Sequence, residues 1–226
     1  MEKYAVVVAG GSGLRMGTSV PKQFLDLRGK PVIWYTLTAF LDAYPDMQVI
    51  LVLPQQHLET GKRIIRATQD PDRIWITVGG ETRFHSVKNG LEHIRRHSIV
   101  FVHDGVRCLL TPDLIRRCYE EAVDKGNAIP ATTAVDTVRL EKFDGTELID
   151  RNKVKLIQTP QTFFSELVKS AFEQDYHESF TDEASVVEKL GVKMHLIEGE
   201  STNLKITRPL DLLIAEKILE EREMGL

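Results

Sequence analysis

Cysteine is scarce in this sequence of 226 residues, and the two that occur, Cys108 and Cys118, form no C-x-x-C pair. Neither lies at metal-ligand spacing from a histidine, so a disulfide scaffold and a structural zinc site are both poorly supported. No apolar run approaches the roughly 18 residues that cross a membrane, and the run from Ala5 to Ala9 is too short for a signal peptide. We therefore expect an unexported cytoplasmic protein with no membrane partner.

An excess of positive charge is also lacking. Lysine and arginine together number 29, aspartate and glutamate 33, and the formal net charge at pH 7 is −4. Proteins that bind nucleic acid broadly carry a basic balance or patch, so we expect no nucleic-acid partner. The 42% of hydrophobic and 27% of charged residues are ordinary for a globular chain. With no linker, repeat or low-complexity tract, the sequence predicts one domain over residues 1–226.

Short β-branched segments alternate with longer amphipathic ones in the first half of the chain. The expected buried parallel strands are 4–8, 49–53, 74–78, 99–103 and 128–131, and the helices between them include 31–43 and 84–97. Alternation of strand and helix predicts an α/β fold with a doubly wound, mostly parallel sheet of the Rossmann-like kind. Trp34 and Trp75 are expected in its core.

The alternation of strand and helix segments changes after residue 134. Residues 135–140 and 147–149 alternate in polarity around a turn at Asp144-Gly145, which predicts a β-hairpin arm at about 135–155 that leaves the main sheet. Beyond it we expect a strand near 154–158, helices at 162–174 and 182–190, a strand at 193–197 and a final helix from Pro209. Val135, Val138 and Leu140 would make such a hairpin unstable alone, which favours a partner surface. The alternative is an arm packed back on its own domain.

A glycine-rich loop, AGGSGLRMG at residues 9–17, follows the first expected strand. Glycines at the carboxyl end of such a strand let backbone N–H groups approach phosphate oxygens, and Arg15 and Lys22 add two cations. The dinucleotide fingerprint G-x-G-x-x-G fails because Met16 stands where the third glycine is needed, and no Gly-Lys-Ser/Thr completes an ATPase P-loop. What remains is the pattern of nucleotidyltransferases that form sugar nucleotides, or else a tight turn with solvated cations.

This loop, together with Pro21-Lys22-Gln23, resembles the signature loop of the 2-C-methyl-D-erythritol 4-phosphate cytidylyltransferases of non-mevalonate isoprenoid biosynthesis. Further matches follow in the family's order at 79–83, Ser86, 103–107, 136–137, 150–152, 158–161, 181–185 and 203–209. The resemblance implies a Rossmann-like nucleotidyltransferase fold. It also implies transfer of a cytidylyl group from CTP to methylerythritol phosphate by metal-assisted in-line attack, with Mg²⁺ or another divalent cation as cofactor.

The resemblance also implies roles for individual residues. Catalytic positions would be Arg15, Lys22, Lys205 and Arg151. Nucleotide-binding positions would be Ala9, Gly10, Gly11, Gly80, Arg83 and Ser86. Acceptor-binding positions would be Asp104, Arg107, Thr137, Arg151 and Thr159, with Asp104 suited to a metal or to a sugar hydroxyl. In the family, the arm that carries Thr137 and Arg151 reaches into the neighbouring subunit, which implies a homodimer with shared sites.

Other interpretations stay open at this point. The family's Asp-Ala-Ala-Arg-Pro appears here as residues 104–108 with Gly105, Val106 and Cys108, and Leu210 replaces an acidic residue. Related cytidylyltransferases use D-ribitol 5-phosphate, so CDP-ribitol synthesis is the alternative activity. A non-catalytic nucleotide-binding module and an NAD-dependent oxidoreductase are alternatives of other classes. Residues 181–183 serve the site or merely cap a helix, and His85 and His103 are expected to be packed or hydrogen-bonded side chains.

Overall fold

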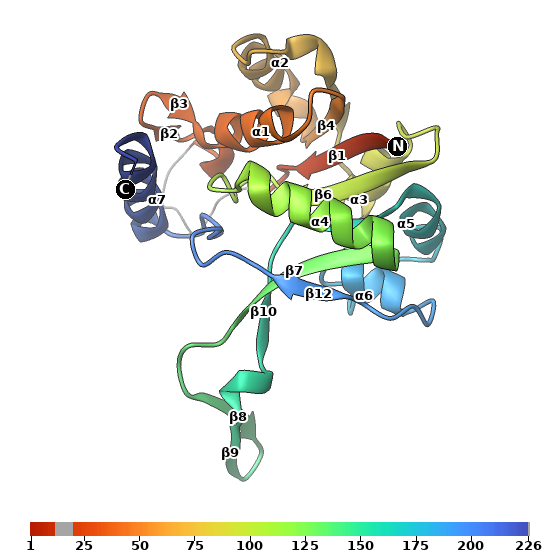
Figure 1. The fold of residues 1–226 in the computed structure, drawn as a ribbon, viewed down its shortest axis with the longest axis vertical. Coiled ribbons are helices and arrows are strands. Elements are labelled where there is room, and N and C mark those ends of the chain that lie inside the picture. The colour runs from red at the N-terminus through yellow and green to blue at the C-terminus, as the bar shows by residue number, and fades with distance from the viewer. Residues whose placement is uncertain (12–19, 226) are drawn as a thin grey trace.

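The computed structural model describes residues 1–11 and 20–225 and is organised around one central sheet (Figure 1). The strand order is β10-β7-β11-β6-β1-β4-β5, and β12 also pairs with β7; outside the parallel half these are β7 (Asn127–Thr133), β10 (Lys155–Ile157), β11 (Gln161–Phe164) and β12 (Leu196–Glu198). The parallel half consists of β1 (Glu2–Val8), β4 (Met47–Leu53), β5 (Ile74–Val78) and β6 (Ser98–Asp104). These four strands are the β-branched segments that the sequence predicted.

Helices cover both faces of the sheet, because successive side chains of each strand point to opposite sides. On one face, Ala5 and Val7 of β1 pack with α1 (Val32–Ala43), α2 (Leu58–Arg66) and α4 (Pro112–Lys125). On the other, Val6 and Val8 pack with α3 (Arg83–Leu91), α5 (Ser165–Ala171) and α6 (Glu183–Glu188). The doubly wound arrangement is therefore confirmed.

Helix α4 shows how local sequence sets an element's bounds. The Thr111 side chain accepts a hydrogen bond from the backbone of Leu114, and Pro112 occupies the first turn, where its missing N–H costs nothing. The helix ends at Gly126, whose φ of +91° lies in the left-handed region that favours glycine. The last helix, α7 (Pro209–Glu223), packs Ala215 against a third apolar cluster that includes β2 (Asp26–Leu27); β2 pairs with β3 (Lys30–Pro31).

The second half of the sheet differs from the sequence prediction at β11 (Gln161–Phe164). A helix was expected from residue 162, but α5 begins only at Ser165, because Thr162 and Phe163 pair with both β6 and β7 in antiparallel ladders. Two β-favouring side chains thus fill the gap between two sheet strands. As a result, β7 (Asn127–Thr133), which was predicted as the parallel strand 128–131, pairs antiparallel with β11 and β10 (Lys155–Ile157) and is parallel only to β12 (Leu196–Glu198).

Three smaller expectations also need correction. Helix α3 ends at Leu91, well before residue 97, although Ile94 is still buried. Trp75 is 46% exposed, because β5 is the last strand of the sheet order and has one open side. Trp34 is only partly buried and donates its Nε1–H to the carbonyl of Ala67.

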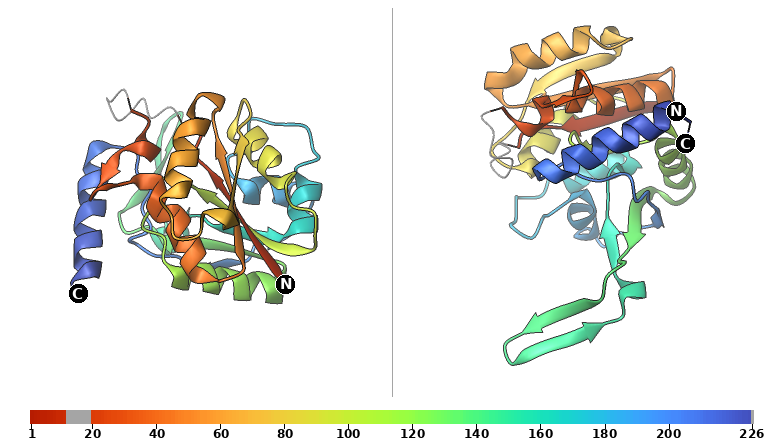
Figure 2. Two further views of the ribbon diagram at one scale, coloured as in Figure 1. Left: turned by 90° about the horizontal axis from the view of Figure 1, so that it is seen from above. Right: turned by 90° about the vertical axis from the view of Figure 1, so that its left-hand side faces the viewer.

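The arm contains the antiparallel hairpin of β8 (Val138–Lys142) and β9 (Gly145–Ile149), which projects from the body of the molecule (Figures 1 and 2). Gly145 has a φ of +142°, which the tight turn requires. Val135, Leu140, Phe143 and Leu148 are all exposed along it. A role for this arm in dimerisation stays a prediction.

Both cysteine side chains are buried and free of any disulfide. Burial raises the pKa of the Cys108 thiol and of the Cys118 thiol to about 12, so neither is a reactive thiolate at neutral pH. Cys108 packs in the third apolar cluster beside Leu27 and Leu109. Among the helices of the described residues, none is long and apolar enough to cross a membrane.

Candidate active site

A cavity of about 520 Å³ lies at the carboxyl ends of the parallel strands. In open α/β sheets this edge is where ligands bind. The structure brings together here most of the residues proposed from the sequence, namely Ala9, Gly10, Gly11, Lys22, Gly80, Arg83, Ser86, Asp104 and Lys205. Arg15 lies outside the described residues.

The beginning of the glycine-rich loop is held by main-chain and side-chain hydrogen bonds. The Ala9 N–H donates to the Val52 carbonyl at 3.0 Å, and the Gln23 amide donates to the Ala9 carbonyl at 2.8 Å. Gln23 is 1% exposed and lines the same cavity, although the signature Pro21-Lys22-Gln23 assigned it no role of its own. Gln23 therefore fixes the position of the backbone at Ala9, where the chain leaves β1.

Gly105 explains one departure from the family pattern. A Cβ atom at this position would lie 2.5 Å from Ile33 Cδ1 and 3.0 Å from Ala9 Cβ, which is closer than side chains approach. The glycine therefore lets Ile33 of α1 pack against the chain just after β6, and no functional group is lost with the missing methyl.

Two lysines are held on one wall of the cavity. Lys22, on the short helix η2 (Lys22–Phe24), is 9% exposed and donates from Nζ to the carbonyl of Ile206 at 2.9 Å. Lys205 precedes Ile206 in the chain, and its Nζ lies 2.7 Å from Asp104 Oδ2. Residue 206 thus accepts from one ammonium group and residue 205 carries the other, so two segments far apart in sequence bring positive charge to the same cavity.

Asp104, the last residue of β6, is the anion of the cavity. Arg83 donates to its Oδ1 from Nε at 3.1 Å, and Lys205 pairs with its Oδ2. Burial of this 8%-exposed residue would raise the carboxyl pKa, but the charges of Arg83 and Lys205 outweigh burial and hold the pKa well below its ordinary value. The carboxylate is therefore ionised at neutral pH and suited to a cation or a hydroxyl.

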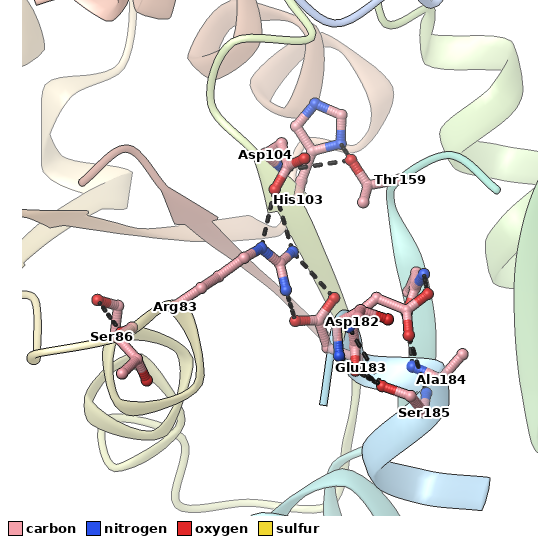
Figure 3. Close-up of polar contacts among 12 residues, drawn as sticks. Arg83, Ser86, His103, Asp104, Thr159, Asp182, Glu183, Ala184 and Ser185 are labelled. Atoms are coloured by element: carbon pink, nitrogen blue, oxygen red, sulfur yellow. Dashed lines mark hydrogen bonds and ion pairs between the residues drawn. The ribbon is translucent and has the colours of Figure 1, made fainter. Parts of the chain in front are cut away.

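Arg83 begins α3 and connects Asp104 to a second carboxylate, Glu183 (Figure 3). Its guanidinium makes two bonds to Glu183, Nη1 to Oε1 and Nη2 to Oε2. Burial would lower the pKa of Arg83, but the two carboxylates outweigh it and raise the pKa. The neighbouring Asp182 caps α6 as expected, by accepting the Ser185 N–H at 2.9 Å. Glu183 had no separate signal in the sequence, since capping explained residues 181–183 equally well.

Ser86 shapes the turn that precedes α3. Its hydroxyl donates to the Thr82 carbonyl at 2.9 Å and accepts from the Gly80 N–H at 3.1 Å. A Cβ at Gly80 would meet the His85 backbone carbonyl carbon at 2.9 Å, so glycine is required there. The predicted nucleotide-binding residues Gly80 and Ser86 therefore form one compact turn on the cavity wall.

Behind Asp104 lies a buried hydrogen-bonded chain. The Thr159 hydroxyl accepts from the Asp104 N–H at 3.1 Å and so donates to His103 Nδ1, 3.0 Å away. His103 Nε2–H then donates to the Arg107 carbonyl at 3.3 Å. Burial lowers the pKa of His103 to about 3, in agreement with a neutral imidazole. Arg107 donates in turn to the Asn203 carbonyl at 2.7 Å.

The predicted acceptor residues fall into two groups. Thr159 and Arg107 are linked to Asp104 by the series of hydrogen bonds just described, but neither lines the 520 Å³ cavity. Thr137 and Arg151 are exposed on the arm, and the Arg151 guanidinium donates to the Val135 carbonyl at 2.6 Å. The structure of one chain therefore does not bring the arm residues to its own cavity.

A metal would find few protein ligands here. Within residues 1–11 and 20–225, no cluster of three or more His, Cys, Asp or Glu side chains could hold an ion. Mg²⁺ is nevertheless often bound by one or two carboxylates together with substrate phosphates and water. An ionised Asp104 facing the cavity fits that donor set.

The open α/β sheet, the glycines that follow β1 at its carboxyl edge and the cations around one cavity are those of a nucleotidyltransferase. Residues 4–221 match the family model described as IspD, 2-C-methyl-D-erythritol 4-phosphate cytidylyltransferase. The chain belongs to this family. Its resemblance to the family, inferred from the motifs, is thereby confirmed.

Relatives and solved structures agree with this assignment. The chain is 46% identical to the 2-C-methyl-D-erythritol 4-phosphate cytidylyltransferase of Bacteroides fragilis, covering 97% of this chain and 100% of the relative. It is 45% identical to that of Phocaeicola vulgatus, with the same coverages. Among crystal structures, the 4-diphosphocytidyl-2C-methyl-D-erythritol synthase of Anaerococcus prevotii is similar with a TM-score of 0.84 at 27% identity, covering 97% of this chain and 96% of the other. The cytidylyltransferase of Thermus thermophilus is similar with a TM-score of 0.76 at 30% identity, covering 97% and 100%.

Proposed function

We propose that this protein transfers the cytidylyl group of CTP to 2-C-methyl-D-erythritol 4-phosphate. A phosphate oxygen of the acceptor attacks the α-phosphorus of CTP in line, a new P–O bond forms, and pyrophosphate leaves with the electrons of the broken bond. The observation that carries the proposal is the cavity that Lys22, Lys205 and Asp104 line together with Gly10 and Gly11. The product is the CDP-methylerythritol intermediate of isoprenoid synthesis.

The lysines are proposed to stabilise the charge that develops on the phosphates. Reactions of this type need no covalent nucleophile, and their catalysis is mostly positioning and charge stabilisation. Lys22 is almost fully buried, so water screens its charge little, and its position is fixed by the Ile206 carbonyl. Lys205 would act near the α-phosphate, and Arg15 is proposed to act with them on the triphosphate.

The nucleoside is proposed to lie against the two turns of the cavity. Backbone groups of Ala9, Gly10 and Gly11 would form one side, and the turn of Gly80, Arg83 and Ser86 the other. CTP is proposed as the nucleotide because residues 4–221 match the cytidylyltransferase family model.

Asp104 is the residue proposed to hold Mg²⁺ or another divalent cation. When bound, such an ion would draw negative charge from the triphosphate oxygens. The ionised carboxylate supports this role, as does its partner Lys205, whose side chain is 41% exposed and can exchange toward a phosphate. The chain's own contribution is to keep the carboxylate ionised and oriented.

Acceptor binding is proposed to involve two chains. Asp104, Arg107 and Thr159 would serve from one subunit, and Thr137 and Arg151 from the arm of its partner. The exposed apolar residues of the projecting arm support a homodimer, since a lone hairpin is marginal in water. The buried free thiols suit a reducing compartment, and the cytoplasm is the proposed location.

The direct test is release of pyrophosphate from CTP by the purified enzyme with Mg²⁺. Methylerythritol phosphate and ribitol 5-phosphate are supplied in parallel reactions, with a third reaction that lacks any acceptor. We expect rapid release in the reaction with methylerythritol phosphate and not in the other two. Preference for ribitol 5-phosphate would replace the proposed acceptor, and no release with either would overturn the activity.

A further inference from the structure

Glu183 is a fully buried carboxylate that the proposed reaction does not use. It is 0% exposed, and burial raises its pKa against the opposing charge of Arg83. Burying a carboxylate is costly unless its partners compensate, and an apolar side chain can often replace such a group without loss of stability. Its neighbour Asp182 already caps α6. Neither helix capping nor packing therefore explains a charge at this position.

Hydrogen bonds to the sheet hold the first turn of α6 in place, and with it the backbone of Glu183. The Gln161 side chain on β11 donates to Asp182 Oδ2 at 2.8 Å and accepts the Ala184 N–H at 2.7 Å. Residue 161 pairs with Val102 of β6, the strand that ends in Asp104. One side chain thus holds the residues on both sides of Glu183 against β11, which pairs with the strand that carries Asp104.

The charges along this line alternate in sign. Arg83 lies between Glu183 and Asp104, and Lys205 pairs with the far oxygen of Asp104. Without Glu183, the Arg83 guanidinium would have Asp104 as its single carboxylate partner among the described ion pairs. With Glu183 present, part of the positive charge of Arg83 is neutralised on the side away from Asp104. Asp104 Oδ2 is then left to interact with groups in the cavity.

We infer that Glu183 is a positioning residue for the proposed cytidylyl transfer. It holds Arg83 by two bonds, so that Arg83 orients Asp104 while Asp104 keeps its negative charge toward the cavity. The inference rests on the proposed function, because the group that Glu183 acts through is the carboxylate proposed to meet the metal or the acceptor. Glu183 itself touches no substrate.

The test compares Glu183→Gln, which removes the charge and keeps the shape, with Glu183→Asp, which keeps the charge. Pyrophosphate release is measured with both substrates varied, well below the melting temperature of each variant. We expect Glu183→Gln to lower kcat at least 10-fold without raising the KM of CTP, since Arg83, left with Asp104 as its one carboxylate partner, still attracts the triphosphate. Glu183→Asp should give a kcat between those of Glu183→Gln and the wild type.

The matched control is Glu166→Gln on α5, which removes an exposed pair with His97 and should leave turnover unchanged. A kcat of Glu183→Gln within 2-fold of wild type would overturn the inference. A lower kcat accompanied by a rise in the KM of both substrates, in proportion to the loss of thermal stability, would also overturn it. If Glu183→Gln does not fold, Glu183→Asp decides: lower kcat at unchanged CTP KM supports positioning, and unchanged kcat overturns it. An inactive wild type would instead refute the proposed function.

Discussion

The buried imidazole of His103 should make the folded state lose stability as the pH falls below about 6.5. His103 is 0% exposed, accepts from the Thr159 hydroxyl and donates to the Arg107 carbonyl, so a second proton would break the first bond. Its pKa is lowered to about 3 in the folded protein, against about 6.5 in an unfolded chain. The unfolded state therefore binds more protons between these values, and the stability rises with pH across that window.

The magnitude follows from linkage. One such group changes the free energy of unfolding by up to about 1.4 kcal/mol per pH unit within the window. Summed from pH 7 to pH 5 with an unfolded pKa of about 6.5, the loss is about 2 kcal/mol. Any folded pKa below about 4 gives nearly the same loss, since this pH range lies above it.

Urea unfolding at pH 5, 6 and 7, followed by the fluorescence of Trp34 and Trp75, would measure the effect in wild type and His103→Gln. Glutamine keeps a donor for the Arg107 carbonyl and does not titrate. The effect of its different packing on the free energy of unfolding is therefore the same at every pH. Contributions of all other groups cancel in the difference between the two proteins. The stability advantage of wild type should shrink by about 2 kcal/mol between pH 7 and pH 5.

The same substitution at His57, on the partly exposed helix η3 (Gln55–His57), controls for the general loss of a histidine. An advantage that stays constant with pH to within about 0.5 kcal/mol, the precision of the extrapolation, would refute the reasoning. It would mean that His103 binds its proton equally well in the folded and unfolded states.

Four further predictions concern catalysis and packing. Lys22→Ala should slow pyrophosphate release about 100- to 1,000-fold with an unchanged circular dichroism spectrum, and full activity would remove the charge-stabilisation role. Arg151→Ala should raise the KM of the acceptor more than that of CTP, and a verified mixed dimer with Lys22→Ala should regain part of the activity; no recovery would contradict shared sites. Excess EDTA should abolish turnover, whereas unchanged turnover would exclude the metal-assisted scheme. Gly90→Ala should destabilise the fold in urea, because its Cβ would lie 2.5 Å from Val6 Cγ1. That packing cost of about 1–3 kcal/mol exceeds the helix-propensity gain of about 1 kcal/mol, and an equal stability would contradict it.

The sequence predicted those parts of the site that depend on local chemistry. A glycine-rich turn must follow β1 if phosphates are to approach, and Asp104 must end a buried strand if it is to face the same edge. Such features combine a residue type with a strand end, and both are readable along the chain. Lys205 was placed by resemblance, and the structure brings it to Asp104 across about 100 residues of sequence.

What could not be predicted depends on contacts between distant elements. Gln23 and Glu183 are polar residues whose role exists only through Ala9 and Arg83, and nothing near them in the sequence reveals those partners. Thr162 and Phe163 fit a helix as well as a strand until β6 and β7 are seen to flank them. Trp75 was expected in the core, because its place on an outer strand could not be read from composition.

The insertion of β11 between β6 and β7 has a consequence for synthesis on the ribosome. All strands of the parallel half are complete once Asp104 has emerged, but the free edge of β6 cannot be closed until residues 161–164 follow. Until then the nascent chain presents an open strand edge to other chains, and β7 has no place beside β6. Thr159, which binds the Asp104 N–H, arrives with the same stretch. The backbone of Asp104 thus gains its Thr159 partner only when the stretch leading into β11, more than fifty residues further along the chain, has been made.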